Sequence, residues 1–335
     1  MKLELCGYFD CNFGDDYMQK ITVRHMPEFE FCIDSSDGSP SPIVLAEKNV
    51  KEKTADETAK IPKLLVTGSG FMVNSREALL CEIVWFLRAK HIADYCIGCN
   101  IEPFPGKFAE WLVSKKLGKF KTVICRDKAS LLWLQKHCPK TESVYMPDIL
   151  FAMPRSGFPS KTDGENLGIS LIQYDGYYYE AMAKIADFWI KATGKGVILM
   201  AFNTGSENDV LACEKVKKLM KSKYKTKIVK HGVCGEILKA YSECRKIIGA
   251  RFHSAVLSLK CEIDFYPIYH RIKMRNLMSD LNYPIKGNDI SSVDIDKIEN
   301  FLRLESTGFK LDKKIEAKTM ESFEILKEQI RKKER

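Results

Sequence analysis

The chain has 335 residues, a formal net charge of +9, 45% hydrophobic residues and 29% charged residues. This length is sufficient for two domains with separate cores, and the composition is typical of a water-soluble globular protein. No run of about 18 apolar residues occurs, which excludes a membrane-spanning helix. The N-terminal segment MKLELCGYFD lacks the apolar core of a signal peptide. We therefore expect a cytoplasmic protein.

The positive charge favours an anionic substrate or an anionic membrane surface, although part of it lies in the C-terminal segment RKKER. No basic stripe alternates with aromatic residues, so nucleic acid is not an expected partner. The twelve cysteines show no framework spacing, which favours reduced core thiols over disulfides. Cys96 and Cys99 form a CxxC motif, but no second Cys or His pair stands at ligand spacing. No metal is therefore expected.

The N-terminal half alternates short apolar strands with amphipathic helices. Strands are expected at 3–7, 29–33, 63–66, 95–100 and 122–125, and helices at 77–89, 107–117 and 129–136. The helix at 77–89 is expected to face inward with its apolar residues Leu79, Leu80, Ile83, Val84 and Leu87. Residues 34–60 are rich in Ser, Pro, Lys and Glu and predict an exposed or partly disordered excursion.

Polar residues follow several of these strands, at the edge where open parallel sheets bind ligands. Asn12, Gly14 and Asp15 follow the first strand, although Asp15 can instead cap the next helix. Gly68-Ser69-Gly70 follows the third strand, where glycines serve turn geometry as readily as ligand binding. Arg126 follows the fifth strand and either faces a ligand or pairs with a nearby carboxylate.

The C-terminal half repeats the pattern after a linker-like segment at 154–165. Strands are expected at 167–172, 196–201, 227–230, 246–249 and 263–267, and helices at 174–193, 209–223, 236–243, 252–259 and 312–332. The expected fold class is α/β, with two Rossmann-like doubly wound domains and a cleft between them. The expected domains are residues 1–153 and 154–311, with residues 312–335 as a C-terminal helix packing back across the junction.

The segment from Cys244 to Arg275 contains a strand, a turn, a helix and a second strand. Its turn carries Arg251 and His253 at the expected helix N-terminus, where free backbone N–H groups favour an anion. Arg251 can bind a phosphate or carboxylate through two N–H groups, and His253 can transfer a proton near neutral pH. The alternative is a basic residue that caps nothing and a histidine that packs on the sheet.

These motifs, in this order, resemble those of the polysaccharide pyruvyl transferases, a family with a GT-B-like fold. The matching segments are GYFDCNFGD at 7–15, GSG at 68–70, GCNIEP at 98–103, RDKAS at 126–130, PD at 147–148 and GARFHS at 249–254, followed by Pro267 and the Tyr269-to-Lys273 spacing. The chain departs from the family pattern at Ser69, in the altered loop at 98–103 and at residues 34–60.

The resemblance implies transfer of the enolpyruvyl group of phosphoenolpyruvate to a sugar, giving a pyruvate ketal in surface polysaccharide biosynthesis. Phosphoenolpyruvate is then a co-substrate and no cofactor is required. The implied donor-binding residues are Arg126, Arg251, Lys273 and Ser254, with Arg126 and Arg251 converging from the two domains. The implied acceptor-binding residues are Asn12, Gly14, Asp15 and Ser69, and the implied catalytic residues are His253, Arg251 and Asp15. The acceptor is a lipid-linked or nucleotide-linked sugar, which permits peripheral association with the inner face of a membrane.

Two other functions remain open at this point. A GT-B glycosyltransferase with a nucleotide-sugar donor needs a ribose-binding carboxylate late in the chain, for which Asp264 and Glu262 are the candidates. A catalytically silent binding protein is the other alternative. The presence of Arg126, Arg251 and His253 argues against it.

Overall fold

The computed structural model describes residues 1–34, 40–53, 61–68, 70–88, 92–154 and 164–334. The chain forms two compact units. The N-terminal unit contains Met1–Phe9, Asp15–Ala152 and Lys313–Arg335, and the C-terminal unit contains Asp10–Gly14 and Met153–Asp312. Ser69 and most of the linker-like segment lie outside the described residues.

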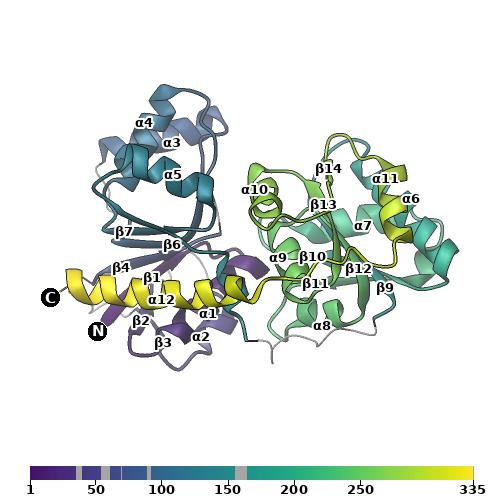
Figure 1. The fold of residues 1–335 in the computed structure, drawn as a ribbon, viewed down its shortest axis with the longest axis horizontal. Helices are drawn as coiled ribbons and strands as arrows, with labels where there is room; N and C mark the ends of the chain where they lie inside the picture. Colours follow the sequence, from purple (N-terminus) through teal and green to yellow (C-terminus); the bar gives the residue numbers. More distant parts are fainter. Residues whose placement is uncertain (35–39, 54–60, 69, 89–91, 155–163, 335) are drawn as a thin grey trace. The chain divides into compact units, whose positions relative to one another are not determined.

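The N-terminal unit is built on a parallel sheet of order β3-β2-β1-β4-β6-β7-β8, with β5 paired to β6 (Figure 1). Its strands are β1 (Lys2–Gly7), β2 (Glu30–Ile33), β3 (Val50–Glu52), β4 (Lys63–Val66), β5 (Gly70–Phe71), β6 (Tyr95–Ile101), β7 (Thr122–Cys125) and β8 (Glu142–Tyr145). The chain moves outward from β1 in both directions, so the connections reverse between β1 and β4. Ligands bind at such a reversal in open α/β sheets.

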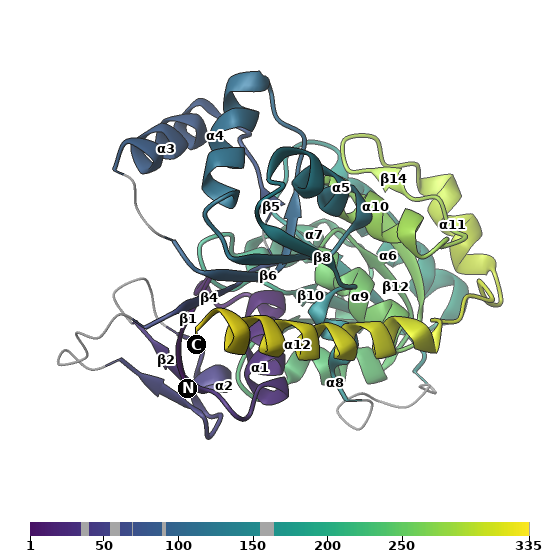
Figure 2. The ribbon, with the colours of Figure 1, turned by 60° about the vertical axis from the view of Figure 1, so that its left-hand side comes forward.

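The helices of this unit are α1 (Phe13–His25), α2 (Pro42–Leu45), α3 (Arg76–Leu87), α4 (Lys107–Leu117), α5 (Lys128–His137), the 3-10 helix η2 (Ile149–Ala152) and the C-terminal α12 (Lys313–Lys333). α12 packs on this unit although it ends the chain (Figure 2). The His25 ring stacks on Phe323 with 4.9 Å between ring centroids, and Arg331 pairs with Glu28 at 2.7 Å. The N-terminal unit is therefore completed by the end of the chain.

The C-terminal unit has a parallel sheet of order β11-β10-β9-β12-β13-β14. Its strands are β9 (Asn166–Leu171), β10 (Val197–Ala201), β11 (Thr226–Lys230), β12 (Cys244–Gly249), β13 (Asp264–Tyr269) and β14 (Asn288–Asp289), and its helices are α6 (Tyr178–Thr193), α7 (Asp209–Leu219), η4 (Lys223–Lys225), α8 (Glu236–Ser242), α9 (Phe252–Lys260), α10 (Ile272–Asp280) and α11 (Ile295–Arg303). In chain order this is the 3-2-1-4-5-6 arrangement of a Rossmann fold, with its reversal between β9 and β12.

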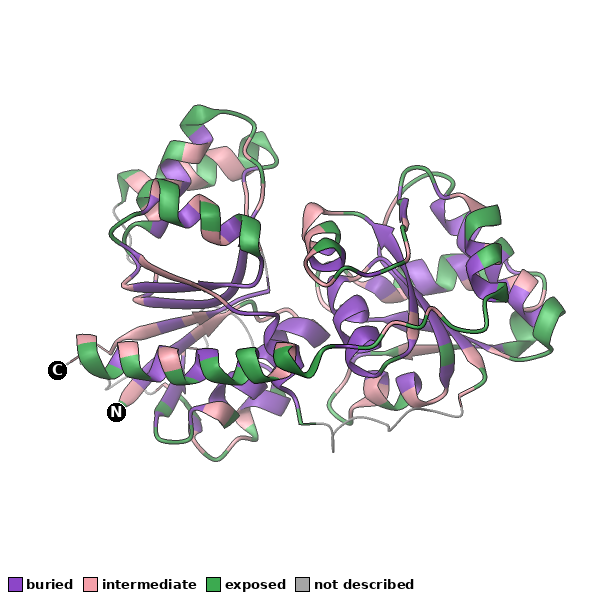
Figure 3. Ribbon diagram, in the orientation of Figure 1, coloured by how far each residue is buried: buried purple, intermediate pink, exposed green. Residues whose placement is uncertain are grey.

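The core of the C-terminal unit explains the stability of this arrangement. α6 buries Met182, Ile185 and Trp189 at a spacing of three to four residues, which places them on one face of the helix. That face belongs to the same apolar cluster as strand residues Leu167 and Leu199. Each large side chain buried in this way contributes about 1.5–3 kcal/mol. The central strands β9, β10 and β12 are buried along nearly their whole length (Figure 3), as expected for a parallel sheet covered by helices on both faces.

Two predictions from the sequence are wrong. α3 has no buried residue, and Leu80 and Leu87 are exposed instead of facing inward. Of the predicted exposed or partly disordered excursion at 34–60, residues 35–39 and 54–60 lie outside the described residues. In the remainder the prediction is wrong, because α2 buries Ile43 and Val44, and β3 pairs with β2. Apolar periodicity identifies one face of a helix but does not show whether another element covers it.

All twelve cysteines are free thiols, and most of them are buried. Among the described residues, no helix combines the length and the apolar character needed to cross a membrane.

Candidate functional site

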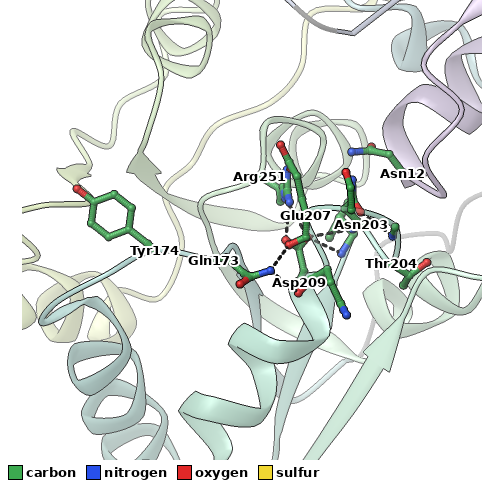
Figure 4. Close-up of polar contacts among 12 residues, drawn as sticks. Asn12, Gln173, Tyr174, Asn203, Thr204, Glu207, Asp209 and Arg251 are labelled. Atoms are coloured by element: carbon green, nitrogen blue, oxygen red, sulfur yellow. Dashed lines mark hydrogen bonds and ion pairs between the residues drawn. The ribbon is translucent and has the colours of Figure 1, made fainter. Parts of the chain in front are cut away.

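The richest polar cluster of the C-terminal unit lies at the carboxyl edge of its sheet, beside the reversal between β9 and β12. Gln173 follows β9, the segment 203–209 follows β10, and Arg251 follows β12 (Figure 4). These segments are separated in the sequence, and the parallel sheet brings them together because its carboxyl ends share one edge.

Arg251 is held by two carboxylates. Its Nε and Nη2 donate to Asp209 at 2.8 and 2.5 Å, and its Nη1 donates to Glu207. Burial alone would lower the pKa of Arg251, but the two ion pairs outweigh it and raise that pKa. The guanidinium therefore remains charged and has a fixed orientation at the N-terminus of α9.

The two carboxylates differ in their surroundings. Asp209 is fully buried, and its Oδ2 also accepts the backbone N–H groups of Phe202 at 3.2 Å and Asn203 at 2.9 Å. The Glu207 side chain is 52% exposed and contacts Arg251 from the solvent side. Burial acts to raise the pKa of Glu207, but Arg251 outweighs it and lowers that pKa. Asp209 is thus a buried structural partner of Arg251, whereas Glu207 is its solvent-exposed partner.

Further cations follow β13, the next strand of the sheet. Burial lowers the pKa of His270, and the positive charges of Arg271, Arg251 and Lys273 lower it further. The Lys273 ammonium lies 5.7 Å from the centroid of the Phe252 ring, which directly follows Arg251. Arg271 and Lys273 also lower the pKa of Glu207. This edge of the sheet therefore brings three cations, Arg251, Arg271 and Lys273, close to Glu207, an arrangement suited to an anionic ligand.

His253 lies against the glycine of the N-terminal loop. A Cβ at Gly14 would stand 1.6 Å from His253 Nδ1 and 2.0 Å from Cε1, so only glycine permits this approach. The imidazole is 7% exposed, and its ring packs edge-on against Phe252 with 5.3 Å between centroids. The structure thus brings together two residues that the sequence places 239 positions apart.

The segment Asp10–Gly14 is fastened to the loop after β10. Asp10 accepts hydrogen bonds from Asn203 Nδ2 at 3.2 Å and from the backbone N–H and hydroxyl of Ser206 at 2.8 and 2.7 Å. Asn12 forms a β-bridge with Asn203, and its side chain accepts the Gly14 N–H at 2.9 Å. Asn12 and Gly14, predicted from the sequence as acceptor residues, therefore share the C-terminal unit with His253.

In the N-terminal unit, Arg126 forms a buried network at the carboxyl edge of the sheet. Nη1 donates to Asp148 at 3.2 Å, and Nη2 donates to Asn100 Oδ1 at 2.8 Å and to the Gly68 carbonyl at 2.5 Å. Both side chains of the ion pair are 1% exposed. Of the two alternatives for Arg126, the structure shows the pairing with a nearby carboxylate.

The neighbouring motif residues also serve the architecture of this unit. Asp127 is the N-cap of α5 and accepts the backbone N–H and the hydroxyl of Ser130 at 2.8 and 2.9 Å. The Ser130 hydroxyl accepts the Ile101 N–H at 2.7 Å, which ties α5 to the end of β6. Asp15 is buried in the first turn of α1 and accepts the Gly68 N–H at 3.1 Å.

The remaining predicted residues have the following positions. Ser254 is fully buried, and its hydroxyl accepts a hydrogen bond from the Tyr241 hydroxyl at 3.0 Å. Lys273 is half-buried in the first turn of α10. Asp264 starts β13 at the opposite edge of the sheet and binds Thr307, so it does not serve the glycosyltransferase alternative. Ser69 lies outside the described residues.

Several site residues were missed, namely Asp10, Asn203, Glu207, Asp209, His270 and Arg271. The sequence does indicate Asn203, Glu207 and Asp209. They lie in the polar segment FNTGSEND, which directly follows the apolar strand segment VILMA and so marks the carboxyl end of a strand. Within the described ranges, no group of three or more His, Cys, Asp or Glu side chains is placed to hold a metal ion.

Comparisons with solved structures show the same fold over nearly the whole chain. UDP-N-acetylglucosamine 2-epimerase from Rickettsia bellii has a TM-score of 0.61 and 9% identity, with 98% of this chain and 95% of that chain covered. A glycosyltransferase from Rickettsia africae has a TM-score of 0.54 and 11% identity, with coverages of 96% and 91%. UDP-GlcNAc 2-epimerase from Methanocaldococcus jannaschii, in complex with UDP-GlcNAc and UDP, has a TM-score of 0.55 and 10% identity, with coverages of 98% and 99%. No curated protein matches the chain.

Two Rossmann-like α/β domains and these structural neighbours confirm the predicted fold, which is that of the GT-B class. The sequence comparison then identifies the family. The family model for polysaccharide pyruvyl transferase matches residues 12–271, and the chain belongs to that family of transferases.

Proposed function

We propose that the protein transfers the enolpyruvyl group of phosphoenolpyruvate to a lipid-linked or nucleotide-linked sugar, forming a pyruvate ketal in surface polysaccharide biosynthesis. The observation that carries this proposal is the group of cations at the carboxyl edge of the C-terminal sheet, with His253 two residues after Arg251. Phosphoenolpyruvate presents a phosphate and a carboxylate, and an anion of this kind needs more than one cationic anchor.

Arg251 and Lys273 are the proposed donor anchors, and the newly found Arg271 joins them. Because Asp209 holds Nε and Nη2 of Arg251, the donor would replace Glu207 at Nη1. The guanidinium would also stabilise the charge on the departing phosphate. The Arg126 guanidinium already donates hydrogen bonds to Asp148, Asn100 and Gly68. We therefore propose that Arg126 positions the loop that carries Gly68.

The reaction needs one proton donor and one proton acceptor. An oxygen of the sugar bonds to the central carbon of the enolpyruvyl group while the methylene carbon takes up a proton. The bond from the central carbon to the phosphate oxygen then breaks, and a second sugar oxygen bonds to that carbon. The two sugar hydroxyls release two protons. One proton balances the proton taken up by the new methyl group, and the other is taken up by the released phosphate. His253 is the proposed proton carrier, and Asp15 is proposed to orient the acceptor hydroxyl.

A thermal-shift titration tests donor binding. A ligand that binds only the folded protein raises its melting temperature as the concentration passes the dissociation constant. We expect stabilisation by phosphoenolpyruvate, and stabilisation by nucleotide-sugars alone would favour a glycosyltransferase. If a nucleotide-sugar is the acceptor, its effect should add to that of phosphoenolpyruvate in a combined titration.

Two variants separate binding from chemistry. Arg251→Lys keeps a positive charge beside buried Asp209 but loses the planar guanidinium, which can bind two oxygens at once. The substitution should therefore weaken phosphoenolpyruvate binding without unfolding the C-terminal unit. His253→Ala should leave that binding in place and abolish acceptor-dependent release of phosphate. Retention of most turnover by His253→Ala would remove the histidine from the mechanism.

A further inference from the structure

The outer side of α3 and the start of α4 carry an exposed apolar surface. It consists of Leu80, Val84 and Leu87 on α3, with exposed fractions of 61%, 44% and 75%, and of Phe108 and Trp111 on α4, with 55% and 42%. The three α3 residues are spaced by four and three positions, so they lie on one face of the helix. Single exposed apolar residues are ordinary, but five on two adjacent helices form a patch of the kind that marks an interaction site.

Aromatic contacts hold α3 against α4. Phe86 of α3 lies 5.1 Å from Trp111 of α4 between ring centroids, and Trp111 stacks on Phe108 at 6.1 Å. The opposite side of α3 is attached to α4, because Glu82 pairs with Lys116 at 2.6 Å and Lys119 lies 4.5 Å from the Trp85 ring. Figures 2 and 3 show the two helices side by side, with exposed residues on their outer turns. The fold thus holds α3 by its polar and aromatic side and leaves its leucines in solvent.

Positive charge predominates among the exposed charged residues of the same two helices. The exposed charged residues of α3, α4 and the described residues that directly follow them are five cations and one anion, namely Arg76, Arg88, Lys107, Lys115, Lys119 and Glu77. Helices that combine exposed leucine and aromatic side chains with an excess of Lys and Arg are typical of those that lie in the interface of an anionic bilayer. A second copy of the chain is a poorer occupant, because a two-fold contact through these helices would bring two positively charged surfaces together.

We propose that this surface binds the chain peripherally to an anionic lipid bilayer, with the apolar side chains entering the headgroup region and the cations contacting lipid phosphates. The inference rests on exposure and charge in the N-terminal unit alone and does not depend on the identity of the donor.

Cosedimentation with vesicles tests the proposal. The full chain should sediment with vesicles of phosphatidylcholine containing phosphatidylglycerol, less with phosphatidylcholine alone, and less at high salt. Leu80→Ser and Leu87→Ser should each lower the partition coefficient about tenfold, because each removes one leucine from the bilayer interface. Leu219→Ser is the matched control, since Leu219 is a 50% exposed leucine on α7 of the other unit.

The pair Lys221→Ser and Lys223→Ser controls for charge alone, because both lysines are exposed residues of the basic segment that follows α7. Loss of vesicle binding in that pair with retention in the leucine variants would overturn the proposal. Vesicle-free self-association that the leucine variants abolish would also overturn it, by assigning the surface to a second copy.

A measurement on the unaltered chain covers the case in which the serine variants do not fold. Lipids brominated in their upper acyl chains should quench tryptophan fluorescence, and Trp111→Phe should remove most of that quenching. Absence of quenching in vesicles containing phosphatidylglycerol would refute the proposal.

Discussion

The imidazole of His253 packs directly on the backbone of Gly14, where a methyl group would lie 1.6 Å from Nδ1. Gly14→Ala must therefore displace the ring or the loop. We expect the substitution to lower turnover by at least about tenfold and the stability by about 1–3 kcal/mol, the usual cost of overpacking.

Gly106→Ala is the matched control for that substitution. A methyl group added at Gly106 would meet no atom within 4 Å, and the φ of 178° at this residue is extended backbone open to any residue. Steady-state kinetics and thermal unfolding of both variants test the contact. Normal turnover in Gly14→Ala would show that the position of the ring is not needed for the reaction.

The buried pair of Arg126 and Asp148 yields a second prediction. Arg126→Met leaves the Asp148 carboxylate without its cation in a region where both side chains are 1% exposed. Loss of one partner from a buried pair costs about 3–5 kcal/mol. Arg303→Met removes an exposed pair with Glu299 and should cost no more than about 1 kcal/mol. Denaturant unfolding of both variants makes the comparison. An unchanged stability of Arg126→Met together with weaker donor binding would instead support a ligand-binding role.

The sequence predicted the central strands well because each is a short apolar run between turn residues. β4, β7 and α4 have the predicted bounds. α10, α11 and β14 were not predicted, since the segment 272–303 mixes apolar and charged residues without an uninterrupted apolar run. Asp294 nevertheless precedes α11 as its N-cap, because its side chain accepts the Lys297 N–H.

The candidate site was predictable only in part, for a physical reason. Strand ends and a helix N-terminus point to Arg251 and His253 by local pattern alone. The carboxylates that hold Arg251 lie 42 and 44 positions earlier in the chain, and nothing local links them. Likewise, the motif at 126–130 and its helix cap are local, but the buried network around Arg126 and the tie from Ser130 to β6 depend on the distant residues Asp148 and Ile101.

His25 gives a prediction on pH. Burial lowers its pKa, and this outweighs the hydrogen bond to the Ala152 carbonyl at 3.1 Å. The folded protein therefore favours neutral His25. The stability it provides is complete above the unfolded pKa of about 6.5 and is lost as the pH falls through the lower folded pKa. Melting temperatures measured from neutral to mildly acidic pH should fall less steeply in His25→Gln, which keeps an N–H donor but does not titrate. Equal slopes in the two proteins would contradict the prediction.

Glu207 gives the last prediction, which concerns donor affinity. Its carboxylate occupies Nη1 of Arg251 from the solvent side, whereas Asp209 holds the other edge of the guanidinium from the protein interior. An anionic donor that binds Arg251 must displace Glu207 and accept repulsion from it. Removal of one exposed pairing partner is worth up to about 1 kcal/mol, so Glu207→Gln should bind phosphoenolpyruvate up to about fivefold more tightly.

The gain should shrink as salt is added, because the charges at this edge are partly screened. Glu299→Gln changes another carboxylate of this unit, 24% exposed and paired with Arg303, and should leave the affinity unchanged. Titration calorimetry at two ionic strengths distinguishes the cases. Weaker binding in Glu207→Gln would mean that Glu207 orients Arg251 for the donor rather than competing with it, and the direction of the change in affinity thereby assigns the role of this carboxylate.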